Sequence, residues 1–219
     1  MRILALSILI LFAGLISLAP RVCALLYDFE DAGQMDDWQV TDGQGEMEGG
    51  AFVLQAAGGE GKAFVGNTDW TDYTITCKAT MVGGNNNYGV IYRYQDNVNY
   101  YMNSIKFVDQ QATWAARING NYLQGQAGMR LPFASEMNKQ YELKIEVEGN
   151  RFKFYVDGEL VQEFTNDEFE KGAVGIRVYD SQAVFGDFEV NGLGILKSGL
   201  AVAPTGKLAV AWGDIRSQN

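Results

Sequence analysis

Residues 141–164, with the sequence YELKIEVEGNRFKFYVDGELVQEF, restrict the possible folds more than any other segment. Apolar and polar side chains alternate along 141–148 and again along 151–157, a period of two that is typical of half-buried antiparallel strands. Gly149 and Asn150 between these arms tolerate the positive φ of a two-residue hairpin turn. The loop length predicts the cross-strand pairs Glu148 with Arg151, Val147 with Phe152, Glu146 with Lys153 and Ile145 with Phe154. We therefore predict a hairpin with one polar and one apolar face, in an all-β protein.

The N-terminal segment predicts export. Arg2 is followed by an apolar run over residues 3–18, and small residues ending at Ala24 form a typical cleavage site of a secretory signal peptide. The run is 16 residues long, shorter than the roughly 20 residues that span a bilayer, which disfavours the alternative of a retained membrane anchor. We predict a signal peptide over 1–24 and a secreted or periplasmic mature protein that does not bind membranes.

The chain is acidic, with a formal net charge of −10. Cleavage after Ala24 changes this charge to −12, because Arg2 and Arg21 are lost without any acid. A charge of this sign repels phosphate backbones and anionic lipids, so nucleic acid is excluded as a partner. Cys77 is the one cysteine after residue 24, so no intrachain disulfide can form in the mature chain. Its place on the apolar parity of a strand predicts a buried, unreactive thiol.

Short strands separated by turns account for the chain up to about residue 192. Turn signals fall at 83–87, 119–121 and 157–158, and a turn near 134–138 is the only helical feature expected. Short strands with turns every 8–12 residues favour a two-sheet antiparallel sandwich. The predicted strands are 27–30, 38–41, 51–55, 62–66, 72–82, 88–95, 99–107, 111–118, 141–148, 151–157, 160–164, 173–179 and 183–190. We predict one monomeric β-sandwich domain over residues 25–192, and a C-terminal tail over 193–219 that could add one short docking strand.

Several segments resemble the concanavalin A-like, laminin G-like jelly rolls of bacterial secreted proteins. They are the opening DFED with Trp38, NTDWTDYTITCKAT, GVIYRYQDNVNYYMNS, the hairpin described above, GAVGIRV and the closing FGDFEV. Relatives of this kind include glycan-binding modules, adhesion domains, family 16 glycoside hydrolases and the 3-keto-disaccharide hydrolases, of which the last have the most similar strand order. The resemblance implies a jelly roll whose partner is an oligo- or polysaccharide, although one fold supports many functions.

The resemblance also implies that sugars lie across the concave face of one sheet, with strands 88–95 and 99–107 at its centre. If residues 96–98 form a three-residue loop, Arg93 lies opposite Tyr101. A loop of even length would force either Arg93 or Asn103 into the core, where an unpaired polar group costs several kcal/mol, so we expect the three-residue loop.

With this register, Arg93, Tyr101 and Asn103 share the concave face, and Arg117 on the next strand has the parity to join them. Guanidinium and amide groups hydrogen-bond the vicinal hydroxyls of sugars, and aromatic rings stack on their CH-rich faces. We therefore predict these four residues as the ligand-binding site. The alternative is that both arginines only pair with neighbouring carboxylates.

Catalysis has less support in the sequence. The chain contains no histidine, which excludes a Ser–His–Asp triad and a His-ligated metal. The 3-keto-disaccharide hydrolases carry an acidic residue in the strand that corresponds to YYMNS, and Tyr101 occupies that position here. Two carboxylates on the ligand face would favour an enzyme. We predict a non-catalytic carbohydrate-binding module; the alternatives are a glycoside hydrolase on the same scaffold and a protein-binding adhesion module.

A structural calcium ion is the one cofactor that the sequence predicts. The resemblance implies a calcium site where the first and last strands meet, away from the sugars. Asp28 and Glu30 open the domain and Asp187 closes it, and carboxylate oxygens are the ligands that calcium prefers. The alternative is a hydrated acidic edge without an ion.

Overall fold

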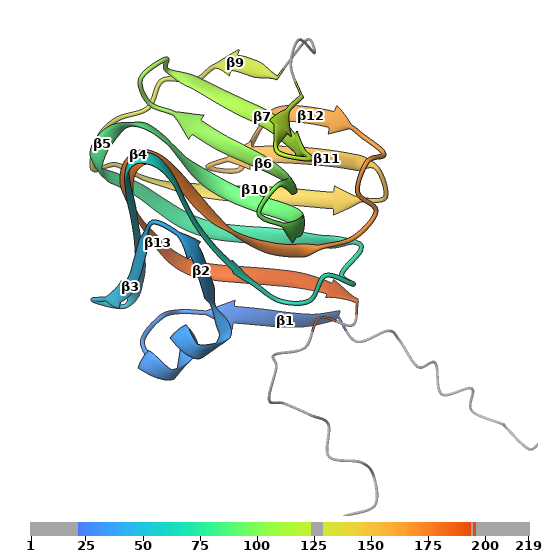
Figure 1. Ribbon diagram of the computed structural model, residues 1–219, viewed down its shortest axis with the longest axis horizontal. Coiled ribbons are helices and arrows are strands. Elements are labelled where there is room, and N and C mark those ends of the chain that lie inside the picture. The colour runs from blue at the N-terminus through green and yellow to red at the C-terminus, as the bar shows by residue number, and fades with distance from the viewer. Residues whose placement is uncertain (1–21, 124–128, 194, 196–219) are drawn as a thin grey trace, which may run out of the picture.

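The computed structural model describes residues 22–123, 129–193 and 195, which form thirteen strands and one short 3-10 helix (Figure 1). The elements are β1 (Val22–Tyr27), η1 (Ala32–Asp37), β2 (Gln39–Asp42), β3 (Gln44–Glu48), β4 (Ala51–Val65), β5 (Tyr73–Asp96), β6 (Asn99–Lys106), β7 (Gln111–Ile118), β8 (Asn121–Tyr122), β9 (Arg130–Pro132), β10 (Gln140–Glu148), β11 (Arg151–Val156), β12 (Glu159–Thr165) and β13 (Ala173–Leu193). All strand pairs are antiparallel, which confirms the predicted all-β class.

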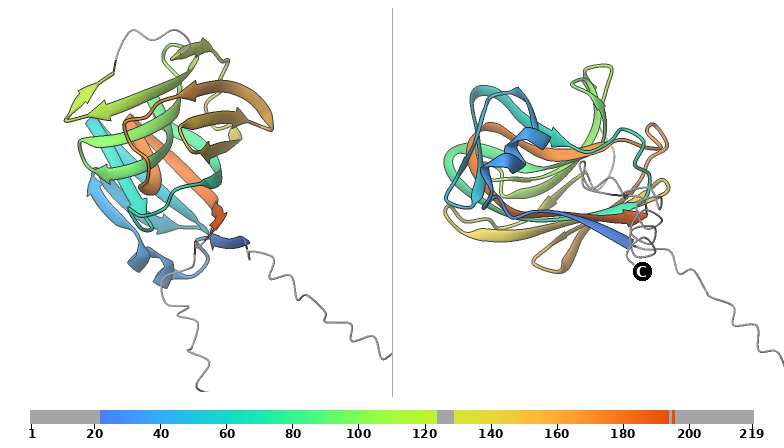
Figure 2. Two further views of the ribbon diagram at one scale, coloured as in Figure 1. Left: turned by 90° about the vertical axis from the view of Figure 1, so that its right-hand side faces the viewer. Right: turned by 90° about the horizontal axis from the view of Figure 1, so that it is seen from below.

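Two layers of sheet pack against each other, and three long strands run through both (Figures 1 and 2). Sheet I has the order β2-β4-β13-β5-β6-β7 and contains residues 61–65 of β4, 87–94 of β5 and 173–179 of β13; β8 and β9 pair with the far edge of β7. Sheet II has the order β3-β4-β13-β5-β10-β11-β12 and uses the other halves of the long strands, with β1 against the end of β13. This arrangement is the predicted jelly-roll sandwich.

The long strands change sheet where they bend. Gly84 has φ 73°, and an added Cβ would lie 2.5 Å from the Asp180 carbonyl oxygen, so only glycine fits there. Asp180 on β13 also has positive φ, and the register shifts between Tyr179 and Ser181. Such bulges bend a strand without ending it. The glycine-rich segment 83–87 is therefore a bend inside β5 and not the turn that its composition predicts.

The hairpin of β10 and β11 has the predicted register at all four pairs, and Gly149 in its turn has φ 53°. The chain start differs from the prediction, because the first strand is β1 and not 27–30, and β1 pairs with the end of β13. A helical turn forms at η1, and residues 134–138 contain none. Cleavage after Ala24 would leave three residues of β1 in the mature chain.

The inner faces of the two sheets form one apolar core. Trp38 packs its ring against Phe52 and Phe188, with ring centroids 5.2 and 5.0 Å apart, and joins both layers. Burial of each such side chain stabilises the fold by roughly 1.5–3 kcal/mol. Within the described ranges no helix is long and apolar enough to cross a membrane. Residues 1–21 of the predicted signal peptide and 196–219 of the predicted tail lie outside those ranges.

The reactivity of the Cys77 thiol tests the packing of sheet II. Its side chain is completely buried, and burial, together with the charge of Glu142, raises the pKa of the thiol above its usual value. Because thiolate is the reactive form, we expect thiol reagents to label native Cys77 slowly and the urea-unfolded protein quickly. Mass spectrometry of labelled protein over time measures both rates, and rapid labelling of the native protein would contradict this packing.

Candidate functional site

The pairing of β5 with β6 differs by one residue from the predicted register. Tyr92 lies opposite Tyr101, and Val90 lies opposite Asn103. The ladder becomes irregular between Tyr92 and Asp96, where Arg93 has φ 51°. The predicted three-residue loop 96–98 is therefore shorter by one residue, because β5 continues through this bulge to Asp96.

Tyr101 and Asn103 consequently point into the core and not onto an open face. The Asn103 amide oxygen accepts a hydrogen bond from the Tyr92 hydroxyl at 2.8 Å, and its amide nitrogen donates to Gln162 of β12 at 3.1 Å. The Trp114 indole N–H donates to the same Tyr92 hydroxyl at 2.8 Å. Since these polar groups are paired, burying Asn103 does not carry the penalty that the predicted register was chosen to avoid.

Arg93 is also fully buried, at the end of the sandwich. Its Nη2 donates to the Gly149 carbonyl at 2.9 Å and lies 3.7 Å from the Asp72 carboxylate, and its guanidinium stacks over the Tyr73 ring. The prediction that Arg93, Tyr101 and Asn103 share an exposed binding face is therefore wrong. Of the four predicted ligand-binding residues, Arg117 alone lies on the outer face of sheet I.

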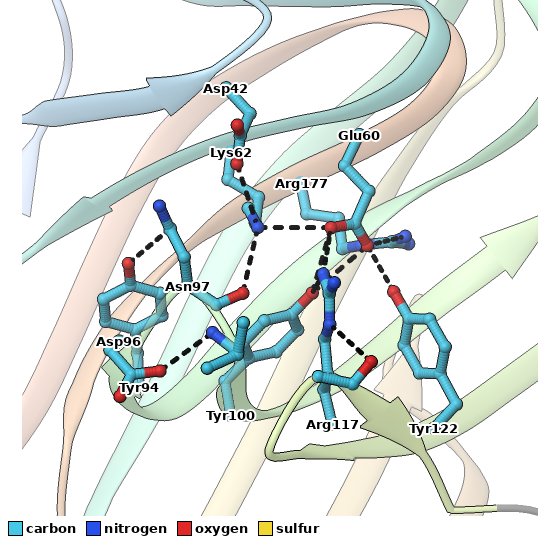
Figure 3. Close-up of polar contacts among 12 residues, drawn as sticks. Asp42, Glu60, Lys62, Tyr94, Asp96, Asn97, Tyr100, Arg117, Tyr122 and Arg177 are labelled. Atoms are coloured by element: carbon cyan, nitrogen blue, oxygen red, sulfur yellow. Dashed lines mark hydrogen bonds and ion pairs between the residues drawn. The ribbon is translucent and has the colours of Figure 1, made fainter.

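A cluster around Glu60 occupies that outer face, as Figure 3 shows. The Glu60 carboxylate accepts hydrogen bonds or ion pairs from five side chains on five strands: Lys62 of β4 at 3.1 Å, Tyr100 of β6 at 3.1 Å, Arg117 of β7 at 2.5 Å, Arg177 of β13 at 2.8 Å and Tyr122 of β8. We call these six residues the Glu60 cluster. Cross-strand register explains the convergence, because Tyr100 pairs with Arg117 and Arg117 with Tyr122, while Arg177 pairs with Lys62.

The cations of the Glu60 cluster are unusually buried. Lys62 and Arg177 are each 2% exposed. Lys62 also pairs with Asp42 of β2 at 3.0 Å and donates to the Asn97 carbonyl at 3.3 Å, and Arg177 donates to the Asn87 side chain at 2.5 Å. Buried charges are tolerated only when they are paired in this way.

Electrostatics keep Glu60 ionised. Burial alone would raise the pKa of its carboxyl, but the charge of Arg177, hydrogen bonds from Tyr122 and Arg177, and the charge of Lys62 hold the pKa well below its usual range. A carboxyl with such a low pKa carries no proton near neutral pH. Glu60 therefore cannot act as a general acid, although it can orient cations and accept hydrogen bonds.

Two cavities hollow the outer face on either side of Tyr122 and Tyr179. The first, of about 490 Å³, is lined by four members of the Glu60 cluster together with Asp42 and Asn97, and we call it the Asp42 cavity. The four are Glu60, Lys62, Arg117 and Tyr122. The second, of about 620 Å³, extends over β6, β7 and β9 to Arg130, and we call it the Arg130 cavity. Tyr122 and Tyr179 line both, so the two cavities are continuous neighbours.

Sequence reasoning missed Glu60, Lys62 and Arg177. Strand alternation contained a signal for two of them. Lys62 and Phe64 lie on one face of β4, and Ala63 and Val65 lie on the other face. Arg177 likewise alternates with the buried residues Ile176 and Val178. Neither pattern could show that β2, β4, β13, β6 and β7 meet on one face.

The three predicted calcium ligands have separate surroundings. Asp28 accepts hydrogen bonds from the Gln34 side chain at 2.7 Å and the Glu30 amide at 3.2 Å, whereas Asp187 forms an ion pair with Lys78. The Glu30 carboxylate lies against Gly50 in the β3–β4 turn. In the described part of the chain no three His, Cys, Asp or Glu side chains form a group that could hold a metal. Calcium binding at these residues stays a prediction.

The fold places the chain among the jelly-roll β-sandwiches. More specifically, the chain belongs to the family of 3-keto-alpha-glucoside-1,2-lyase-like domains, whose model matches residues 27–191. The family resemblance stated from the sequence motifs is thereby confirmed.

The chain is also similar to one curated protein and to several solved structures. Levanase of Bacillus subtilis (strain 168) is 30% identical over 152 residues, which are 65% of this chain and 19% of the levanase. The carbohydrate-binding module CBM66 from Bacillus subtilis matches with a TM-score of 0.64 and 23% identity, covering 70% of this chain and 94% of the module. The Bacillus licheniformis β-glucanase matches with a TM-score of 0.55 and 12% identity, covering 77% of this chain and 96% of that protein. The chain thus spans about a fifth of the levanase.

Replacement of Tyr101 tests its placement in the core. Tyr101 is fully buried, and its hydroxyl accepts the Phe169 amide at 2.9 Å. We expect Tyr101→Ala to lower the free energy of unfolding by ~3–5 kcal/mol, as for other large aromatic residues in cores. Urea titration measures this change, with Tyr155→Ala on the solvent side of β11 as the control. If Tyr101→Ala were as stable as wild type, the placement of Tyr101 in the core would be wrong.

Replacement of Glu60 tests the charge cluster. Glu60→Gln keeps the shape but leaves the buried Arg177 without a carboxylate partner, so we expect a loss of ~3–5 kcal/mol at pH 7. Because the folded-state pKa of Glu60 is depressed, its contribution is present above the unfolded value of about 4.3 and is lost as the pH falls below it. The stability difference between wild type and variant should therefore narrow below about pH 4.

Urea denaturation at pH 7 and under acidic conditions measures this difference. Glu163→Gln removes an exposed carboxylate that pairs with Arg151, and this control should change stability little at either pH. If Glu60→Gln were as stable as wild type at pH 7, the cluster would not support the fold.

Proposed function

We propose that this protein is a secreted, non-catalytic carbohydrate-binding module that holds an oligo- or polysaccharide on the outer face of sheet I. The observation that carries the proposal is the Glu60 cluster beside the Asp42 cavity. The similarity to levanase and to the module CBM66 supports a carbohydrate ligand. Export rests on the predicted signal peptide, and a monomer is the expected state.

Groups around the Asp42 cavity suit a sugar. Asp42 and Arg117 are partly exposed, with 45% and 21% of their side chains accessible, and they can accept from and donate to vicinal hydroxyls. The rings of Tyr122 and Tyr179 can stack on the CH-rich face of a sugar. Arg117 lies over the Tyr122 ring at 5.4 Å and Arg177 over the Tyr179 ring at 5.8 Å, so both rings are held before a ligand arrives. A site that is ordered in advance loses less conformational entropy on binding.

An enzyme is the second candidate, because two carboxylates lie on this face. Asp42 and Glu60 contact the same Lys62 ammonium at 3.0 and 3.1 Å. Glycoside hydrolases of the usual type need one carboxyl that holds a proton and one that is ionised. The cations around Glu60 lower its pKa and favour the ionised form, so Glu60 does not supply the protonated carboxyl. The low pKa of Glu60 favours binding over hydrolysis.

Replacement of Tyr179 tests the proposed site. The ring of Tyr179 is 38% exposed, and we expect Tyr179→Ala to weaken binding by roughly 0.5–1.5 kcal/mol if it stacks on a sugar. Tyr155→Ala is a matched control, because Tyr155 also stands on an outer face beneath a cation, Lys144, but on sheet II. A glycan array that includes levan and β-glucans identifies the ligand, and calorimetry measures its affinity.

Product analysis on the same samples separates binding from catalysis. A module should bind without releasing sugar, whereas an enzyme should release sugar and lose this activity in Asp42→Asn. If Tyr179→Ala and Tyr155→Ala bound the array ligand equally well, the outer face of sheet I would not be the binding site.

A further inference from the structure

A row of paired residues crosses the outer face of sheet I beneath the Arg130 cavity. Register links one residue from each of five neighbouring strands, in the order Arg177, Gly89, Ser104, Thr113 and Arg130. The three central residues are small, and the two at the ends are arginines. Four strand spacings separate the ends, which is about 19 Å at the usual distance between strands. Three residues of the row, Arg177, Thr113 and Arg130, line the Arg130 cavity.

The charge around this cavity is of one sign. Among the described residues that line the Arg130 cavity, Lys106, Arg130 and Arg177 are charged, and none of the lining residues carries a carboxylate. Three cations therefore face one cavity in a protein whose net charge is −10.

The three cations differ in the ion pairs and hydrogen bonds that they already form within the protein. Lys106 forms an ion pair with Asp109 at 2.5 Å. Both terminal nitrogens of Arg177 are bonded, to Asn87 and Glu60, but its buried Nε has no hydrogen-bond partner. Arg130 is exposed and forms no ion pair with any residue in the described ranges.

Of the three cations, Arg130 alone has no ion pair in the described ranges, so it is the charge available to an anion in this cavity. The cavity walls exclude part of the solvent, so the field of the cations is stronger there than on an open surface. The planar fork of arginine matches carboxylate and sulfate oxygens, which it binds through paired, charge-assisted hydrogen bonds. The small side chain of Thr113 lines the cavity between the two arginines.

From these observations we propose that the Arg130 cavity binds the anionic group of an acidic polysaccharide, a uronate carboxylate or a sulfate ester, while the Asp42 cavity holds a neighbouring sugar through its hydroxyls. The inference rests on the proposed function and adds the chemical class of the ligand. The acidic surface elsewhere repels polyanions, so their binding requires this local cluster.

Calorimetry with four polymers tests the proposal: polygalacturonate for carboxylate, dextran sulfate for sulfate, and levan and dextran as neutral glycans. We expect binding to one of the two polyanions, and the polymer that binds identifies the anionic group. This binding should weaken as salt rises, because ions screen exposed charges. Arg130→Ala should weaken it about tenfold or more, the effect of losing a hydrogen bond between charged groups. Lys106→Gln is a second variant that should also weaken it.

Lys78→Ala is the matched control, because it removes the same charge from the outer face of sheet II. Thermal unfolding of each variant shows that the fold is retained. Equal loss of polyanion binding in Lys78→Ala and Arg130→Ala would overturn the inference, since the effect would then come from net charge. Binding to levan or dextran alone would also overturn it but leave the proposed function standing. Binding to none of the four polymers, together with an empty glycan array, would overturn both.

Discussion

The outer face of sheet I depends on the charge of one buried carboxylate. Glu60 accepts bonds from side chains on β4, β6, β7, β8 and β13, so a single anion connects strands that are far apart in the sequence. Without it, Lys62 and Arg177 would be cations with almost no access to water. The desolvation of such groups costs several kcal/mol each. A face that binds sugars by hydrogen bonds needs fixed donors and acceptors, and this anion fixes three cations and two tyrosines together.

The bends of the long strands bring these residues to one place. Because β4, β5 and β13 continue from sheet II into sheet I, Lys62 and Arg177 lie beside each other in the centre of sheet I. Glycine is required at the bend, where Gly84 approaches the Asp180 carbonyl too closely for a side chain. The glycine-rich segment is thus important for the position of the site, although it is distant from the cavities along β5. Its composition predicts a turn because the same residues serve turns and bulges.

Sequence patterns predict strand register well where local geometry determines it. They predict it poorly where the register depends on hydrogen-bond partners from other strands. The β10–β11 register followed from alternation and a two-residue turn, both of which are local. The β5–β6 register could not be obtained in this way, because it depends on a positive φ at Arg93 and on whether a buried Asn103 finds partners. Those partners, Tyr92 and Gln162, lie on other strands. Arg117 was found because its parity alone placed it outward, and Glu60 was missed because its importance comes entirely from residues distant in sequence.

Net charge and local charge give different information about ligands. The acidic composition excludes polyanions that bind by long-range attraction alone, such as nucleic acid. It does not describe the outer face of sheet I, where the residues lining the two cavities include five cations, Lys62, Lys106, Arg117, Arg130 and Arg177, against two carboxylates, Asp42 and Glu60. Of the three cations that line the Arg130 cavity, Lys106 and Arg177 are paired with Asp109 and Glu60, whereas Arg130 has no ion pair in the described ranges. In the proposed function, discrimination among glycans would therefore be set by short-range pairing at this face, while the acidic surface elsewhere would repel other polyanions.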